Sequence, residues 1–212
     1  MVKISLLNPG TYNGTYKLIG GSLCLDFSNT ISFRNKTNPH EWLDSIENLI
    51  SWCEITETLN KSQIGFLHKE LLQKDEESEA NWSVLREFRE VIYKIFSAIA
   101  ESKNPSKKDI SFINEIAKQK SSWQELQIKD NQIQISPSQE LSAYEHLICK
   151  IYNSTIETLT QFKTKRIKKC SACQWLFYDT SKNSSRKWCV MEDCGNRDKV
   201  NRFNKRKLDK AK

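Results

Sequence analysis

The sequence predicts an α+β fold, with a mostly helical N-terminal domain that contains a few short strands, followed by a small cysteine-rich finger. Three observations lead to this prediction. Apolar residues recur at helical spacing through much of residues 40–162. Short segments of alternating polar and apolar residues, typical of strands, interrupt that pattern. Four of the seven cysteines then fall within residues 170–194, ahead of a basic C-terminus.

The first elements are a strand and a helix. Residues 16–21 alternate and end in Gly20-Gly21, which indicates a strand that closes in a turn. The apolar segment over residues 23–31 fits a strand or a helix equally well. From residue 40 the spacing becomes helical, and one buried face is expected to contain Trp42, Leu43, Ile46, Leu49, Ile50 and Cys53.

Further helices are predicted downstream. One spans residues 62–72, with Ser62 as its N-cap, and the charged residues 74–79 then form a solvated connection. The clearest amphipathic helix covers residues 82–100, and Asn104-Pro105-Ser106 separates it from a helix over residues 107–118. Its apolar stripe consists of Leu85, Phe88, Ile92, Ile95, Phe96 and Ile99.

A β-hairpin and a long helix complete this part of the chain. Residues 123–128 and 132–136 alternate around Lys129-Asp130-Asn131, which favours a hairpin. Residues 139–162 then read as a helix that runs into the finger. We therefore expect two domains, over residues 1–162 and 163–212.

Charge is divided unevenly between these two parts. The chain has a net charge of +7, but residues 163–212 contain 16 Lys and Arg against 5 Asp and Glu, whereas residues 1–162 contain 17 against 21. A general lysine bias of the proteome is the alternative explanation, but such a bias would spread the positive charge evenly along the chain. A basic end beside a slightly acidic body predicts a polyanion partner, with nucleic acid the first candidate.

The sequence also predicts a cytoplasmic location. It has no run of about 18 apolar residues and no N-terminal secretion signal, so we expect neither a membrane span nor export. Cytoplasmic thiols stay reduced. The scattered Cys24, Cys53 and Cys149 are then interpreted as small buried hydrophobic residues.

The other four cysteines have the spacing of a metal site. Cys170 and Cys173 form a CxxC pair, and Cys189 and Cys194 follow after fifteen residues. Thiolates favour Zn²⁺, and four protein ligands leave no open position, which predicts one structural zinc ion. Disulfide bonds and an iron–sulfur cluster remain as alternatives. A knuckle, a hairpin and a helix that opens at the last cysteine together predict a treble-clef finger.

A basic helix is expected after the last cysteine. Val200 and Phe203 share a face that can pack on the finger, and another face is cationic. Such a helix can lie along a nucleic-acid groove, although a solvated tail without a partner is the alternative. Beside the metal, Asn196 and Arg197 are expected to have mainly local bracing roles. The candidate nucleic-acid-binding residues are Arg197, Lys199, Arg202, Lys205, Arg206 and Lys207.

These residues resemble the CGNR zinc-finger family through the run Cys194-Gly195-Asn196-Arg197. The likeness extends back through residues 176–181 and 186–191, with Val190 standing where the family usually has Ser. The segment GGSLCLDFSNT, residues 20–30, resembles the ABATE domain that commonly precedes this finger. Together the two resemblances cover nearly the whole chain.

The resemblance implies a bacterial, stress-linked transcription regulator that binds DNA through its finger. It also implies that Asp26, Asn29 and Thr30 form a shared polar site for a ligand. The residues themselves offer another interpretation, in which Asp26 and Asn29 cap a helix and satisfy backbone groups.

Our working hypothesis is a DNA-binding regulator whose first domain senses a small-molecule effector or mediates self-association as a homodimer. An RNA- or ribosome-associated factor and a zinc-buttressed protein-interaction module are the rivals. We do not expect an enzyme, because His40, His68 and His146 are far apart in the sequence and no nucleophile motif, phosphate loop or open metal site is visible.

Overall fold

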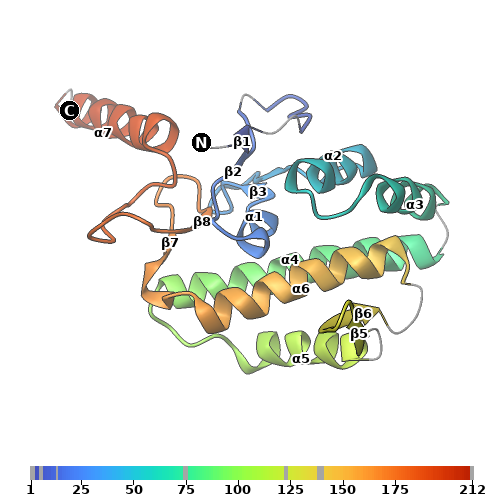
Figure 1. Cartoon of the computed structure of the whole chain (residues 1–212). Helices are drawn as coiled ribbons and strands as arrows, with labels where there is room; N and C mark the ends of the chain where they lie inside the picture. Colours follow the sequence, from blue (N-terminus) through green and yellow to red (C-terminus); the bar gives the residue numbers. More distant parts are fainter. Residues whose placement is uncertain are drawn as a thin grey trace.

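The computed structural model of the chain describes residues 3–4, 7–12, 14–73, 76–121, 124–137 and 141–210. Helices dominate, and the strands are short (Figure 1). The elements follow one another as β1 (Lys3–Ile4), β2 (Lys17–Leu18), α1 (Leu23–Ser28), β3 (Ile31–Ser32), β4 (His40–Glu41), α2 (Ile46–Thr56), α3 (Lys61–Leu72), α4 (Glu76–Ala100), α5 (Lys107–Ser121), β5 (Gln124–Lys129), β6 (Gln132–Pro137), α6 (Ala143–Gln161), the 3-10 turn η1 (Thr164–Arg166), β7 (Ile167–Lys169), β8 (Leu176–Tyr178), the π-helical turn η2 (Met191–Gly195) and α7 (Asn196–Lys210).

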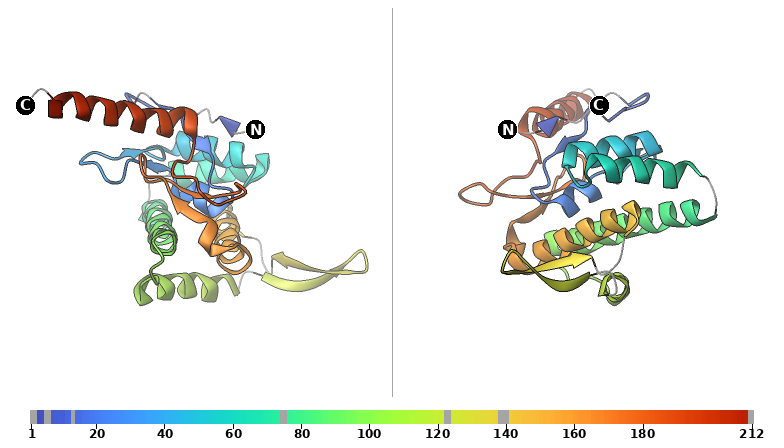
Figure 2. Two further views of the ribbon diagram at one scale, coloured as in Figure 1. Left: turned by 90° about the vertical axis from the view of Figure 1, so that its left-hand side faces the viewer. Right: turned by 45° about the vertical axis from the view of Figure 1, so that its right-hand side comes forward.

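Helices α4 and α6 lie side by side and form the middle of the molecule (Figures 1 and 2). The pair α2 and α3 covers one side of them, and α5 lies on the other. The short helix α1 contacts both α4 and α6, so it lies near the centre of the structure. Its Phe27 is fully buried, as are Trp52 of α2, Phe88 of α4 and Leu147 of α6. These side chains form one continuous core.

Helix α4 contains the predicted stripe, in which Ile99 is half-buried. The other five side chains are buried: Leu85, Phe88, Ile92, Ile95 and Phe96. The helix nevertheless starts earlier than expected. The predicted solvated connection over residues 74–79 is wrong from Glu76 onward, where α4 begins, and Ser78 is buried. Acidic residues in the first turn interact favourably with the positive end of the helix dipole, so this charged run starts a helix. Residues 74–75 lie outside the described part.

Capping side chains set two other helix starts. Asn60, not Ser62, caps α3: the Asn60 side chain accepts from the Gln63 N–H, and the Gln63 side chain accepts from the Asn60 N–H. Ser142 and Glu145 form the same reciprocal pair at α6. A capping box satisfies two backbone donors at once, which fixes the helix start. The described helix α6 therefore begins at Ala143; residues 138–140 of the predicted helix lie outside the described residues.

The segment near residue 40 is extended where a helix was predicted. β4 pairs antiparallel with β3, and Trp42 and Leu43 precede the start of α2 at Ile46. Both side chains are buried all the same, and the Trp42 indole donates to the Ser32 hydroxyl oxygen (2.8 Å). Their helical spacing therefore reflected burial in a shared core rather than a shared helix.

The predicted hairpin is present as β5 and β6, although Trp123 lies outside the described residues. Asp130 and Asn131 both have positive φ, the conformation that a tight two-residue hairpin turn requires. The hairpin projects from the body (Figure 2). It leaves Leu126, Ile128 and Ile133 at least 73% exposed. The alternation of polar and apolar residues therefore predicted the two strands correctly, but the apolar side chains of these strands are not buried.

The C-terminal segment begins with β7 and β8, which pair antiparallel. β7 contacts α4, and β8 contacts α1, so the strands of the finger rest on the helical body. Helix α7 extends away from that body (Figure 1). This arrangement confirms the α+β fold class with a C-terminal cysteine cluster; the treble-clef type of the finger stays a prediction. In the part of the chain that the structure describes, no helix is both long and apolar enough to cross a membrane.

Candidate metal centre and nucleic-acid interface

The four predicted cysteines come together in a buried cluster. The Sγ atoms of Cys170, Cys173, Cys189 and Cys194 all lie within 4.8 Å of one another. Cys189 Sγ is 3.6 Å from the sulfurs of Cys173 and Cys194. A disulfide needs about 2 Å between sulfurs, whereas a tetrahedral ion with Zn–S bonds of about 2.3 Å needs roughly 3.8 Å. The cluster therefore fits one ion and no disulfide.

The chain places each ligand by a local turn. Cys170 follows β7, and its N–H donates to the Trp175 carbonyl (2.8 Å), which closes the first knuckle. Gln174, just after Cys173, has a φ of 67°, which lets the chain reverse into β8. Cys194 lies in η2, where its N–H donates to the Val190 carbonyl (3.0 Å). The two pairs therefore approach each other from a knuckle and from a helix start.

The electrostatics of the cluster call for a cation. Hydrogen bonds from the other three cysteines hold the pKa of Cys170 well below its usual range. The same network raises the pKa of Cys173, because a second buried thiolate this close would be repelled by the first. A bound Zn²⁺ removes this conflict, since it lowers the free energy of all four thiolates. The four cysteines hold one structural Zn²⁺ ion.

The loop between the two cysteine pairs is held by the buried Asp179 and the half-buried Arg166. Asp179 is fully buried and accepts from the N–H groups of Ser181 and Arg186, each at 2.9 Å. The Arg166 guanidinium donates to the carbonyls of Asp179 and Ser181, each at 2.8 Å. Residues 179–186 are therefore tied to η1 and do not depend on the metal alone.

Asn196 and Arg197 brace the base of α7, as their local interpretation predicted. The Asn196 side-chain amide donates to the Glu192 carbonyl (2.9 Å). The Arg197 guanidinium lies over the Phe33 ring, 4.8 Å from its centroid, and interacts electrostatically with Tyr12. Burial raises the pKa of Tyr12, and Arg197 opposes that rise. Arg197 thus joins the finger to the N-terminal segment.

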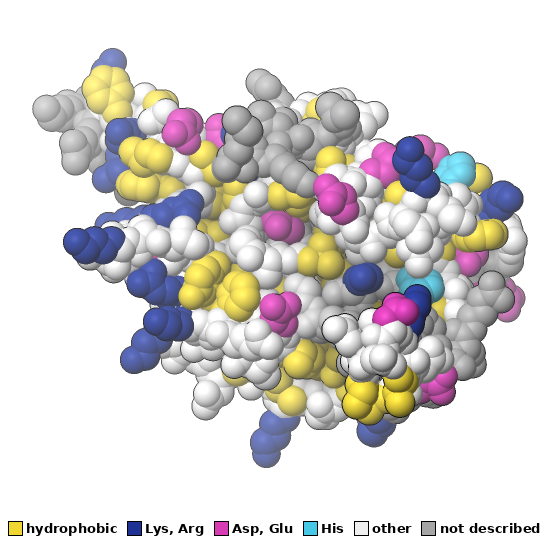
Figure 3. Space-filling view, viewed as in Figure 1, with side chains coloured by type: hydrophobic (Ala, Val, Ile, Leu, Met, Phe, Trp, Pro, Cys, Tyr) yellow, Lys and Arg dark blue, Asp and Glu magenta, His cyan; other side chains and the backbone are white. Residues whose placement is uncertain are grey.

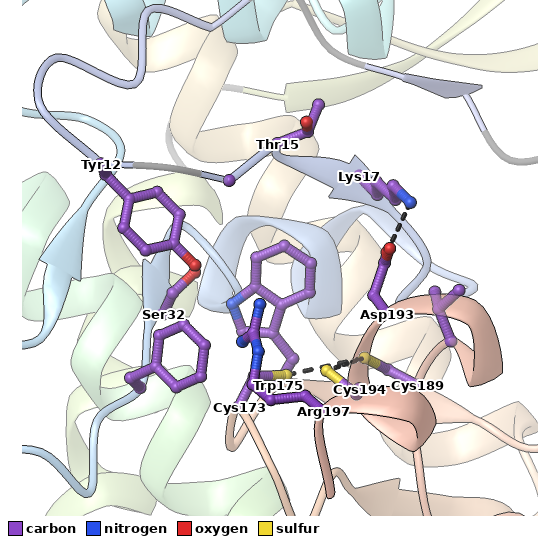
Figure 4. A pocket seen from close by; sticks show the side chains of 13 residues that line it. Tyr12, Thr15, Lys17, Ser32, Cys173, Trp175, Cys189, Asp193, Cys194 and Arg197 are labelled. Atoms are coloured by element: carbon purple, nitrogen blue, oxygen red, sulfur yellow. Dashed lines mark hydrogen bonds and ion pairs between the residues drawn. The ribbon is translucent and has the colours of Figure 1, made fainter. Parts of the chain in front are cut away.

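A cavity of about 200 Å³ lies beside the metal ligands. Figure 4 shows Tyr12 and Ser32 on one side of it and Lys17 on the other, with three of the sulfurs nearby. Lys17 pairs with Asp193 across a distance of 2.5 Å. The finger therefore contacts the N-terminal segment on both sides of this cavity, through Arg197 and through Asp193.

Asp26, Asn29 and Thr30 are close together, but their side chains are used inside the fold. Asp26 Oδ1 accepts from the Gly20 N–H (2.7 Å), and burial raises the pKa of Asp26 to about 7. Asn29 donates to the Leu176 carbonyl (2.8 Å) and accepts from the Leu176 N–H (2.7 Å). None of the three lines the cavity beside the metal. A ligand site at these residues stays a prediction, and the observed bonds match the backbone-satisfying alternative.

Thr30 and the two glycines complete the same region. The Thr30 hydroxyl donates to the Phe27 carbonyl (2.7 Å) and accepts from the buried Arg89 (3.2 Å). A Cβ on Gly20 would lie 2.8 Å from the Asp26 backbone nitrogen, and Gly21 has a φ of 84°. The Gly20 carbonyl accepts from the Tyr178 N–H (2.8 Å). Segment 20–30 is therefore a seam that holds strand β8 of the finger, a role that periodicity and spacing did not predict.

The predicted nucleic-acid residues lie on or at the base of α7. Lys199, Arg202 and Lys207 are exposed, and Arg202 pairs with Asp198 one turn earlier (2.8 Å). The side chains of Lys205 and Arg206 lie outside the described part of the structure. The expected packing of Val200 and Phe203 on the finger is wrong: they are 56% and 58% exposed, because α7 leads away from the finger.

Sequence reasoning assigned no site to a basic hollow at the start of the finger. The hollow has a volume of about 620 Å³ and is lined by Phe162, Lys163, Thr164, Lys165, Arg166, Lys168 and Ser184. The five basic residues among positions 163–169 were the signal that could have identified it. Only folding brings Ser184, from the loop between the cysteine pairs, to its wall.

Comparison with known families agrees with this geometry. Residues 166–207 match the CGNR zinc finger, and residues 21–160 match the ABATE family, which is described as "Putative stress-induced transcription regulator". No curated protein matches the chain. The two matches meet near η1, and they cover residues 21–30 of the seam and the four metal ligands. The chain therefore belongs to the ABATE family, with a CGNR zinc finger as its C-terminal segment.

Proposed function

We propose that the protein is a transcription regulator that binds double-stranded DNA, with the zinc finger holding α7 as the contacting helix. The observation that carries this proposal is the position of α7, which extends from the body with exposed Lys199, Arg202 and Lys207 (Figure 1). A helix that presents cations and is anchored at its base can enter a major groove without moving the rest of the fold.

Charge and length support this role. Residues 163–212 have a net charge of +11, whereas the rest of the chain has a net charge of −4. Attraction to a polyanion is therefore concentrated at one end of the chain. The 15 residues of α7 span about 22 Å, enough to follow a groove across several base pairs. The Asp198–Arg202 pair is partly exposed and contributes little stability, so Arg202 can exchange it for phosphate or a base edge.

A salt titration tests the proposal. Fluorescence anisotropy on labelled duplexes, chosen by selection from a random DNA library, should give a Kd that rises steeply with salt. The K199A/R202A variant should weaken binding about tenfold or more and lower the salt slope by roughly one per lost phosphate contact. K107A/K108A removes two exposed charges from α5 and serves as the control.

The outcome decides between partners. Equal DNA affinity for K199A/R202A and K107A/K108A would contradict the role of α7. Tighter binding of a matched structured RNA pool at the same salt would instead support the RNA-associated alternative.

The exposure of Val200 and Phe203 favours a second candidate, a protein-interaction module. The two side chains form an apolar strip on a helix that already stands clear of the body. A V200S/F203S variant should then lose a protein partner that is retained after nuclease treatment, while K199A/R202A keeps it. Loss in both variants, or in neither, would argue against this candidate.

We further infer a cytoplasmic protein with two domains, over residues 1–162 and 163–212, in which the first receives a small-molecule effector or mediates homodimerisation. The bracing of the finger by Arg197 and by the seam supports communication between the two parts, because each contact joins a finger residue to the N-terminal region. Light scattering with and without DNA tests the dimer.

A further inference from the structure

We propose that the basic hollow at the start of the finger binds a backbone phosphate of the nucleic acid that α7 contacts. This inference rests on the proposed function and adds a second contact point, outside α7. Four of the seven side chains that line the hollow are Lys or Arg, and none is acidic. Such a lining favours an anion, and the anionic group that a nucleic acid offers is a phosphodiester.

Three of those cations, all lysines, have no acidic partner among the residues that the structure describes. Lys163 and Lys165 are exposed and Lys168 is half-buried, and none forms an ion pair with a described residue. Their neighbour Lys169 differs, because it pairs with Glu101, which directly follows α4. The three lysines around the hollow thus keep their full attraction for an anion, whereas the chain uses Lys169 internally.

The frame of the hollow is fixed. The Arg166 guanidinium donates hydrogen bonds to the carbonyls of Asp179 and Ser181. These bonds tie η1 to the loop that carries Ser184. Phe162 packs edge-on against Tyr178, with ring centroids 4.8 Å apart. These contacts hold both walls in place before any ligand arrives, so less ordering is needed on binding.

Ser184 provides an independent observation. Its hydroxyl oxygen is buried and has no hydrogen-bond partner among the described residues, and its φ of 47° holds it in a rare backbone conformation. Buried polar groups nearly always have partners, so an unpaired hydroxyl in the wall of a basic hollow indicates a ligand oxygen. A phosphate oxygen can accept this hydrogen bond while the lysines neutralise its charge.

The surroundings favour a nucleic-acid backbone over a small free anion. The loop that ends one wall continues through the exposed Lys187 to η2 and then to α7. Figure 3 shows Lys and Arg side chains gathered along the side of the molecule that carries α7 and β7. A polymer with regularly spaced phosphates can engage the hollow and α7 together, whereas a single anion engages one of them.

The test compares two triple variants of the full, zinc-loaded chain in the duplex salt titration. K163Q/K165Q/K168Q removes the unpaired charges of the hollow, and K61Q/K107Q/K108Q removes three exposed charges from α3 and α5. We expect the first to weaken binding about tenfold or more at ~50 mM salt and to lower the salt slope by at least about one, and the control to change neither markedly. Zinc content and melting temperature verify that both variants are folded.

A second pair of variants separates the hollow from general electrostatics. S184A should weaken binding roughly two- to tenfold with no change in salt slope, because a neutral hydrogen bond is lost without a charge. S185A, at the exposed neighbouring position, should bind as the unchanged chain does. Equal salt slopes for the two triple variants, or equal affinities for S184A and S185A, would overturn the proposal. If the K199A/R202A variant still loses affinity in that case, DNA binding by α7 stands and only the hollow is excluded.

Discussion

Asp26 shows how one buried side chain links the seam to pH. It accepts the Gly20 N–H in a site that is almost closed to water, and burial raises its pKa from 3.8 to about 7. The folded protein therefore keeps the Asp26 proton up to near pH 7, whereas the unfolded chain releases it near pH 4. The contribution of Asp26 to the free energy of unfolding is fully present below about pH 4 and is lost as the pH rises through about 7.

We expect the D26N variant to be more stable than the unchanged protein at pH 8 and similar to it at pH 4. The difference should reach at most about 4 kcal/mol, because each unit of pKa shift is worth about 1.4 kcal/mol. Urea unfolding of both proteins from pH 4 to 8 measures it. A constant difference across this range would show that Asp26 titrates normally in the folded state.

Asn29 acts as a substitute for a neighbouring strand, because its amide pairs with both backbone groups of Leu176. N29A should lower the free energy of unfolding by about 2–4 kcal/mol, since two buried backbone groups lose their partners. N38A, at an exposed position, should change it by less than about 0.5 kcal/mol. Chemical denaturation of the two variants provides the comparison, and equal stabilities would mean that the seam contributes nothing.

Among the elements, α4 and the β5–β6 hairpin both carry large apolar side chains, but these side chains have opposite environments. The α4 stripe lies between α1, α3 and α5, whereas the hairpin points away from the body (Figure 2). A two-stranded hairpin has one apolar face at most and cannot bury it by itself. Its exposed Leu126, Ile128 and Ile133 therefore add little to the folded state.

This contrast gives a prediction for matched substitutions. I128A/I133A should leave stability within about 0.5 kcal/mol per substitution, because both side chains remain mostly in water in the folded state. I92A, in the fully buried stripe of α4, should cost about 2–5 kcal/mol. Thermal unfolding followed by circular dichroism distinguishes them. A large loss for the hairpin variant would mean that the hairpin face is covered in solution.

At the scale of the whole molecule, the zinc ligands belong to the same core as the helices. Cys170, Cys173, Cys189 and Cys194 form a continuous buried cluster with residues of α1, α4 and α6, and the seam joins that cluster to β8. Metal binding energy can therefore stabilise the helical body as well as the finger.

Zinc removal should consequently lower the melting temperature of the helices and not only that of residues 166–207. A strong chelator, or the C189A substitution, should produce this shift in the far-ultraviolet circular dichroism signal. C53A, which removes a buried cysteine outside the cluster, should keep one zinc per chain. Helices that melt at the same temperature with and without metal would show that the finger and the body fold independently.

The sequence by itself determined the metal ligands and the positions of most helices. The spacing of the four cysteines selected the ligands, because a knuckle brings two thiolates together within one turn of chain. The apolar stripe of α4 could also be predicted, because helical periodicity is a local property of the sequence. Cys24, Cys53 and Cys149 were also correctly predicted to be buried.

Only the tertiary structure decided how distant segments meet. Asn29 and Leu176 are 147 positions apart, and no local pattern predicts that one side chain completes the other's backbone pairing. The exposure of Val200 and Phe203, and the meeting of Ser184 with Lys163, Lys165 and Lys168, depend equally on the direction in which each element leaves its neighbour. Spacing along a chain fixes which side chains share a turn or a face. Packing between elements fixes what that face touches, because burial free energy is gained only where a partner surface is present.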